Sequence, residues 1–117
     1  MTYQQQSDLT MLPQARRLAR TEFDAFMAFH ESVFRDGGAV PLKYRELIAL
    51  AVGSALKCGY CIETHTNGAA AAGASDAELT EAVLVAAAVG AGGTAAHALL
   101  ALRLHEESHE ESKASAH

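Results

Sequence analysis

The sequence predicts an all-α protein with a single domain. Half of its 117 residues are apolar, yet it contains no Trp, four Phe and three Tyr residues. Ala makes up about a fifth of the chain, which favours helices over strands, and the length is usual for one domain. A core built from Ala buries little area for each side chain, so it would gain from further burial between subunits. We therefore expect a homo-oligomer.

Helical spacing of apolar residues and turn signals divide the chain into three parts. Residues 1–12 form a polar N-terminal lead, 13–108 a helical domain and 109–117 a polar C-terminal tail. Within the domain we expect about five to six helices. Five of them are delimited by the sequence: from Pro13 to the Gly37-Gly38 pair, from about Pro41 to Ala55, from the cysteines to Gly73, from Ser75 to about Gly90, and from Gly93 through Leu104. The fourth of these begins with the Ser-x-x-Glu spacing of a capping box, Ser75 to Glu78.

One uncharged stretch, residues 82–102, is long enough to cross a bilayer. It is mostly Ala and Gly, and Gly90, Gly92 and Gly93 interrupt it, so its hydropathy is weak for a membrane span. Two buried helices joined at these glycines account for the same residues. We therefore expect no membrane partner.

The net charge and the N-terminal composition indicate the cellular compartment and exclude some classes of partner. The formal net charge is −5 and no Lys/Arg cluster is present, so we expect no nucleic-acid partner. Residues 1–8 have neither the basic nor the apolar region of a secretory signal, which favours a cytoplasmic protein. Thiols are kept reduced in the cytosol, so a close cysteine pair there is catalytic, redox-sensing or metal-binding rather than a permanent disulfide.

The candidate catalytic residues are Cys58, Cys61, His65, Glu46 and Tyr60. If Cys58 opens a helix, Cys61 and His65 form an i,i+4 pair on the face that also carries Cys58. The helix N-terminus stabilises a thiolate, and His65 can take the proton of Cys61. Glu46 would orient the imidazole if the preceding helix folds back alongside, and Tyr60 offers a phenol as a further proton donor.

This set of side chains is complete for the reduction of a peroxide. A thiolate attacks the O–O bond and becomes a sulfenic acid, which the second cysteine captures as a disulfide. We predict that Cys61 attacks and Cys58 resolves, because Cys61 lies directly beneath His65. An outside dithiol must then reduce the pair through a mixed disulfide. We assign no cofactor and no metal to the site.

Other interpretations of the same residues remain open. The cysteine pair with His65 and Glu46 reaches the ligand count of a zinc site, and two buried cysteines could simply pack in the core. A redox-sensing or adaptor subunit would oxidise once without turnover. His97 and His30 suit core or interface positions satisfied by backbone carbonyls, and Arg45 suits a solvated or intersubunit ion pair.

The pattern Glu46-x11-Cys58-x-x-Cys61-x-x-x-His65 resembles the signature of the alkylhydroperoxidase D family, within the wider carboxymuconolactone decarboxylase-like superfamily. Tyr60 falls where that family often carries Tyr or His in its proton relay, and the similarity covers about residues 15–105. The resemblance implies a helical subunit that assembles into trimers or hexamers. It also implies peroxidase or disulfide reductase activity, with recycling by a lipoyl-bearing protein or another dithiol. The decarboxylase branch generally lacks the two cysteines, which argues against lactone decarboxylation.

Overall fold

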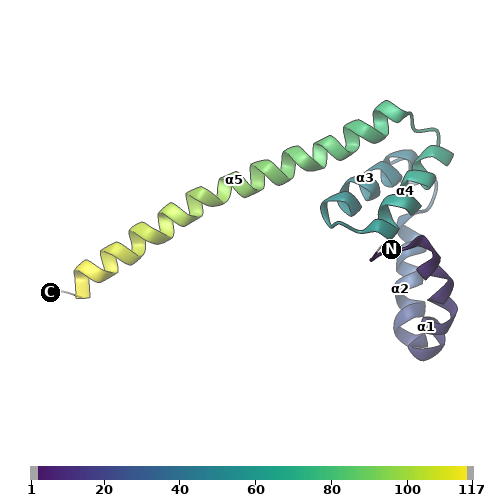
Figure 1. Ribbon diagram of the computed structural model, residues 1–117, viewed down its shortest axis with the longest axis horizontal. Coiled ribbons are helices and arrows are strands. Elements are labelled where there is room, and N and C mark those ends of the chain that lie inside the picture. The colour runs from purple at the N-terminus through teal and green to yellow at the C-terminus, as the bar shows by residue number, and fades with distance from the viewer. Residues whose placement is uncertain (1–2, 116–117) are drawn as a thin grey trace. The chain divides into compact units, whose positions relative to one another are not determined.

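The computed structural model describes residues 3–115, and every regular element among them is helical (Figure 1). The elements in chain order are a 3-10 helix η1 (Gln6–Met11) and the α-helices α1 (Leu12–Leu18), α2 (Arg20–Val33), α3 (Leu42–Ala55), α4 (Gly59–Ala71) and α5 (Asp76–Ser115). The predicted all-α class is confirmed. The chain forms two compact units, Met1–Ala86 and Ala87–His117, and the second contains only helix from α5.

The centre of the first unit is the contact between α3 and α4. Leu47 and Leu50 of α3 and Ala69 of α4 are buried there. Gly53 is buried on α3, and a Cβ atom at this position would lie 2.7 Å from the Cβ of Cys61. The missing side chain therefore allows α3 to approach α4 closely at the second cysteine.

The turn between α3 and α4 places Cys58 at the start of α4. Lys57 follows the end of α3 with a φ of 57°, in the left-handed region that usually favours glycine. The Lys57 amide donates to the carbonyl of Ser54 (3.1 Å), and the Cys58 amide donates to the carbonyl of Gly53 (2.9 Å). These two bonds form a Schellman motif, which closes α3 and fixes the direction in which the chain enters α4.

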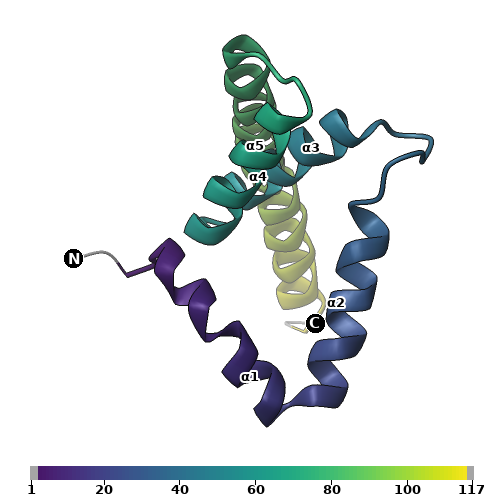
Figure 2. The ribbon, with the colours of Figure 1, turned by 90° about the vertical axis from the view of Figure 1, so that its right-hand side faces the viewer.

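The first predicted helix is wrong as a single element, because the chain bends at Ala19. This residue has φ −140° and ψ 58°, and it separates α1 from α2 (Figure 2). A bidentate contact between Arg16 and Asp24, 2.6 Å at the shorter N–O distance, bridges the bend. The N-terminal lead is also more ordered than predicted, since residues 6–11 form η1. The Gln5 amide donates to the Asp8 carboxylate (3.2 Å) at its start.

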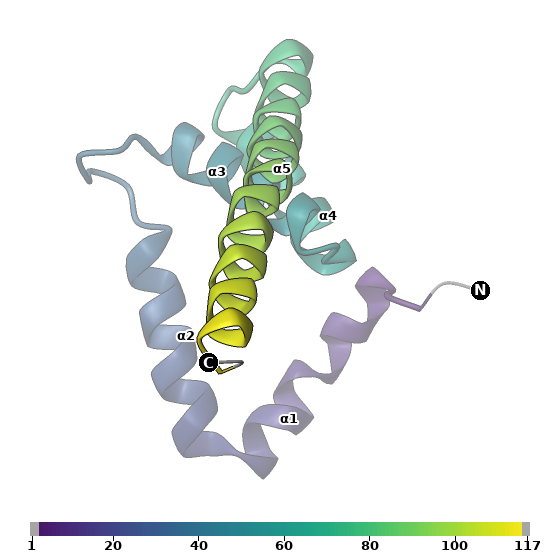
Figure 3. The same ribbon diagram turned by 90° about the vertical axis from the view of Figure 1, so that its left-hand side faces the viewer.

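The predicted break at Gly90, Gly92 and Gly93 is wrong, because α5 is one unbroken helix (Figure 3). Each glycine costs about 1 kcal/mol relative to Ala in a helix interior. The surrounding residues are mostly Ala, the strongest helix former, and no Pro follows to end the helix. The helix also continues to Ser115, through most of the segment expected to be a polar tail.

The beginning of α5 matches the predicted capping box. The Glu78 amide donates to the Ser75 hydroxyl (3.1 Å), and the Ser75 amide donates to the Glu78 carboxylate (2.9 Å). Lys43 of α3 forms an ion pair with the same carboxylate (2.9 Å). This ion pair lowers the pKa of Glu78 and raises that of Lys43.

No residue of α5 is buried within either described unit, and its burial by another subunit stays a prediction. Val85 is 62% exposed in the first unit, and Val89 and Leu99 are 69% and 71% exposed in the second. The same helix is long and apolar enough to cross a membrane by length and composition. That property is weak evidence by itself, since the core helix of a soluble protein has it too.

Candidate active site

The cysteine pair lies at the N-terminus of α4, as the sequence predicts. Cys58 is the N-cap residue, and its sulfur accepts a hydrogen bond from the Cys61 amide (3.2 Å). The two residues form a disulfide with their Cα atoms 5.3 Å apart. The structure therefore represents the oxidised state of the pair. In the reduced state the same helix N-terminus favours a thiolate, because its free N–H groups carry partial positive charge.

Glu46 and His65 form the second part of the site. The Glu46 carboxylate on α3 lies 2.7 Å from Nδ1 of His65 on α4, and only 8% of His65 is exposed. This contact confirms that α3 folds back alongside α4 and brings the two residues together. When Nδ1 holds the hydrogen of this bond, Nε2 is the nitrogen left to accept a proton from another group.

Two neighbours of the Glu46–His65 pair hold it in place. Phe34 stacks on the imidazole of His65, with ring centroids 4.8 Å apart and planes at 18°. Gly68 lies under the Glu46 carboxylate, and a Cβ atom there would be 2.6 Å from the carboxyl carbon. Neither contact could be predicted from the motif, because Phe34 follows the end of α2, outside the motif, and glycines in helices have many uses.

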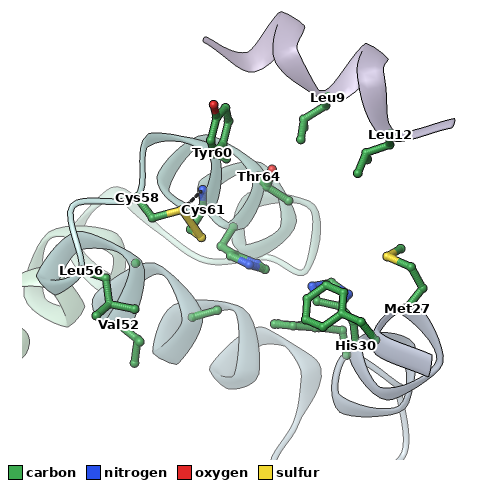
Figure 4. A pocket seen from close by; sticks show the side chains of 15 residues that line it. Leu9, Leu12, Met27, His30, Val52, Leu56, Cys58, Tyr60, Cys61 and Thr64 are labelled. Atoms are coloured by element: carbon green, nitrogen blue, oxygen red, sulfur yellow. Dashed lines mark hydrogen bonds between the residues drawn. A yellow bond between two sulfur atoms is a disulfide. The ribbon is translucent and has the colours of Figure 1, made fainter. Parts of the chain in front are cut away.

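Both cysteines and His65 line one cavity of about 570 Å³ (Figure 4). Most of its wall is apolar and comes from the N-terminal helices as well as from α3 and α4. Among the lining residues are Leu9, Leu12, Phe26, Met27, His30 and Phe34. The bend at Ala19 explains this arrangement, since α1 and α2 contribute to the same wall from either side of it. His30, expected in a core or interface, is one of the residues that line the cavity.

Tyr60 also lines the cavity, but its hydroxyl group bonds to the N-terminal segment. It donates to the Asp8 carboxylate at 2.7 Å. Two further contacts join this segment to α4: the Gly59 backbone amide donates to the Gln4 side chain, and the side-chain Nε2 of Gln6 donates to the Thr64 hydroxyl (3.2 Å). These contacts could not be predicted from the sequence, because nothing local in the polar N-terminal lead indicates that its side chains reach a helix some fifty residues away.

The Asp8–Tyr60 bond makes attachment of the N-terminal segment depend on pH. The bond from Tyr60, helped by the Gln5 amide, lowers the pKa of Asp8, and the same bond raises the pKa of Tyr60. The ionised Asp8 carboxylate stabilises the attached segment above its unfolded pKa, and this stabilisation is lost as pH falls through the lowered pKa of Asp8 in the folded protein. The protonated Tyr60 phenol stabilises the attached segment below its unfolded pKa, and this stabilisation is lost as pH rises through the raised pKa of Tyr60 in the folded protein. The contact therefore holds between about pH 4 and pH 10.

Replacing Tyr60 with Phe should weaken the attachment of the N-terminal segment at neutral pH, because it removes one of the three contacts. We expect the pKa of Asp8 to rise toward its ordinary value, as measured by NMR titration of the carboxyl carbon. Amide hydrogen exchange should also become faster over residues 4–11. Tyr44→Phe is the matched control, since Tyr44 lies exposed on α3 and should leave both measurements unchanged. An unchanged Asp8 titration in Tyr60→Phe would contradict the assignment.

The contacts of Arg45 and His97, two residues expected to have structural roles, can be compared with those expectations. Arg45 donates to the backbone carbonyls of Val33 and Val40, at 2.5 and 2.9 Å, so it fastens the α2–α3 connection. Within the described part of the chain no acidic side chain pairs with it, and an ion pair with another subunit stays a prediction. Nδ1 of His97 lies 2.6 Å from the carbonyl of Gly93, which confirms a backbone partner for this imidazole.

The alternative of a zinc site requires the cysteines, His65 and Glu46 to converge on one point. Across residues 3–115, no three His, Cys, Asp or Glu side chains are arranged to hold a metal ion. The Glu46 carboxylate bonds to the imidazole instead, and the two sulfurs are joined to each other.

Comparison with known proteins gives the family of the chain. The model of the carboxymuconolactone decarboxylase family matches residues 21–104. A protein of Paracoccus denitrificans described as "Uncharacterized protein 4 in cox locus" is 43% identical over 84 residues, which is 72% of this chain and 75% of that protein. The chain therefore belongs to the carboxymuconolactone decarboxylase family, the superfamily to which alkylhydroperoxidase D-like proteins also belong. The matched span contains both helices of the site, and η1 with Asp8 lies before it.

Proposed function

We propose that the protein is a thiol-dependent peroxidase, or disulfide oxidoreductase, that reduces organic hydroperoxides. The observation that carries this proposal is the shared cavity. A disulfide-bonded cysteine pair at a helix N-terminus faces the same space as an imidazole that Glu46 holds at 2.7 Å. A buried structural disulfide needs neither the imidazole nor the carboxylate.

The proposed cycle starts from the dithiol form. His65 takes the proton of Cys61, and the Glu46 carboxylate stabilises the imidazolium. The thiolate attacks one peroxide oxygen, the O–O bond breaks, and the alkoxide leaves as an alcohol after it gains a proton. Cys58 then attacks the sulfenic acid on Cys61, forming the disulfide and releasing water. An outside dithiol reduces the disulfide through two exchange steps and becomes oxidised itself.

A multiple-turnover assay tests this function directly. Consumption of cumene hydroperoxide should continue for many equivalents per subunit when dihydrolipoamide or dithiothreitol is the electron donor. If consumption stops after a single equivalent while the donor is still reduced, the protein is a redox-sensing or adaptor subunit and not an enzyme. That outcome is the second candidate function, and the same disulfide supports it.

We propose a cytoplasmic protein whose reductant is a dithiol, with a lipoyl-bearing protein as the candidate. A reducing compartment supplies the electrons that the cycle needs and keeps the pair reduced between turnovers. Comparing dihydrolipoamide with monothiols as donors tests the dithiol requirement. Equal rates with a monothiol at the same thiol concentration would remove it.

We also propose that the subunit forms a homo-oligomer, a trimer or hexamer, in which other subunits cover the apolar part of α5. The exposed side chains Val85, Val89 and Leu99 support this. Burying one Leu stabilises an interface by roughly 1.5–3 kcal/mol, so Leu99→Glu should weaken association by about tenfold or more. Light scattering after size exclusion should show a lower mass. Ser108→Glu, an exposed change on the same helix, is the control. A wild-type monomer, or a protein soluble only with detergent, would contradict the proposal.

A further inference from the structure

A second imidazole, that of His30, faces the cavity from α2 (Figure 4). Its ring centroid lies 6.4 Å from that of His65 and 4.7 Å from that of Phe34. Phe26 lies on its other side at 6.1 Å. The three contacts fix the ring in the wall of the cavity, beside the imidazole that serves the cysteines.

The other polar side chains in this wall are already engaged. The Tyr60 hydroxyl donates to Asp8, the Thr64 hydroxyl accepts from Gln6, and Nδ1 of His65 faces Glu46. Besides the two cysteines and these engaged groups, His30 is the one further side chain lining the cavity that can donate a proton. An imidazole has two ring nitrogens that can each carry a proton, so it can serve as a general acid.

Reduction of an alkyl hydroperoxide makes two separate demands on protons. One proton must leave the attacking thiol, and one must reach the oxygen that departs when the O–O bond breaks. An alkoxide is a strong base, so its departure is slow unless an acid protonates it in the transition state. The Glu46–His65 pair is built for the first demand, because its carboxylate stabilises the imidazole after it has accepted a proton.

We propose that His30 meets the second demand, as a catalytic residue that protonates the leaving alkoxide. In this step the Cys61 thiolate bonds to one peroxide oxygen and the O–O bond breaks. The other oxygen takes the proton of the His30 imidazolium and leaves as an alcohol. The sulfur is oxidised to a sulfenic acid, the peroxide is reduced, and neutral His30 regains a proton from solvent. The inference rests on the proposed peroxidase function.

Two oxidants with different leaving groups separate this role from a structural one. Cumene hydroperoxide releases an alkoxide, whereas peracetic acid releases a carboxylate that needs no proton. In His30→Gln, we expect the rate of the first oxidation step with cumene hydroperoxide to fall by about 10²-fold. The rate with peracetic acid should stay within the same order of magnitude. Stopped-flow mixing of the pre-reduced protein, with disulfide formation as the readout, makes the result independent of the reductant.

Phe26→Leu is the matched control, because it changes the packing around His30 without removing a proton donor. It should affect both oxidants to a similar extent. An equal loss with both oxidants in His30→Gln would show that His30 only shapes the cavity, and would overturn the inference. A wild-type protein that forms its disulfide with neither oxidant would instead overturn the peroxidase function itself.

Discussion

Replacing Cys61 with serine is expected to lower peroxide turnover by about 10³-fold or more, because an alcohol cannot act as the redox nucleophile. Cys61 lies one helical turn before His65 on α4, where the imidazole can take its proton. The steady-state consumption of cumene hydroperoxide with dithiothreitol measures the effect. Cys58→Ser should keep the first oxidation of Cys61, but the added dithiol must then reduce the sulfenic acid directly, so turnover should become slower.

The trapped product distinguishes the roles of the two cysteines. After one equivalent of peroxide, a sulfenate-specific reagent should label Cys61 in Cys58→Ser and should leave Cys61→Ser unlabelled. The N-cap position makes this a real test, since the bond from the Cys61 amide favours a thiolate on Cys58 as well. A sulfenate retained on Cys58 in Cys61→Ser, and none on Cys61 in the other variant, would reverse the assignment.

The parts of the site that could be predicted from sequence are those encoded by short-range spacing. Cys58, Cys61 and His65 lie on one helix, so helical periodicity alone brings them together. Glu46 requires only that two consecutive helices pack side by side, which their apolar faces and the tight turn at Lys57 make possible.

The remaining contacts depend on segments that are distant in sequence, and the pattern could not supply them. Asp8 reaches Tyr60 from a segment that looked like a polar lead, and the bend at Ala19 brings α1 and α2 to a shared wall. No Gly or Pro marks that bend.

The continuity of α5 was predicted wrongly for the opposite reason. Its glycines are visible helix breakers, but the high propensity of the surrounding Ala residues outweighs them.

Removing the charge of the Glu46 carboxylate is expected to lower the turnover rate by about 10²-fold, because the carboxylate orients His65 and stabilises the imidazolium. Glu46→Gln keeps the size of the side chain and removes its charge. We expect kcat/KM for cumene hydroperoxide to fall by that factor, while the protein stays folded and its disulfide can still form slowly. Full activity in this variant would show that the contact at 2.7 Å has no part in proton transfer.

Gly68→Ala tests the same contact without changing either member of the pair. The new methyl group would lie 2.6 Å from the carboxyl carbon of Glu46, so the carboxylate must move away from the imidazole. Removing a helical glycine should by itself stabilise the fold by about 0.5–1 kcal/mol. Gly90→Ala provides the control, since open space surrounds that position. The two variants should therefore be distinguished by measuring both thermal unfolding and turnover. Gly90→Ala should gain stability at unchanged turnover, and Gly68→Ala should lose turnover toward the level of Glu46→Gln. Wild-type turnover in Gly68→Ala would mean that His65 works without a carboxylate held against it.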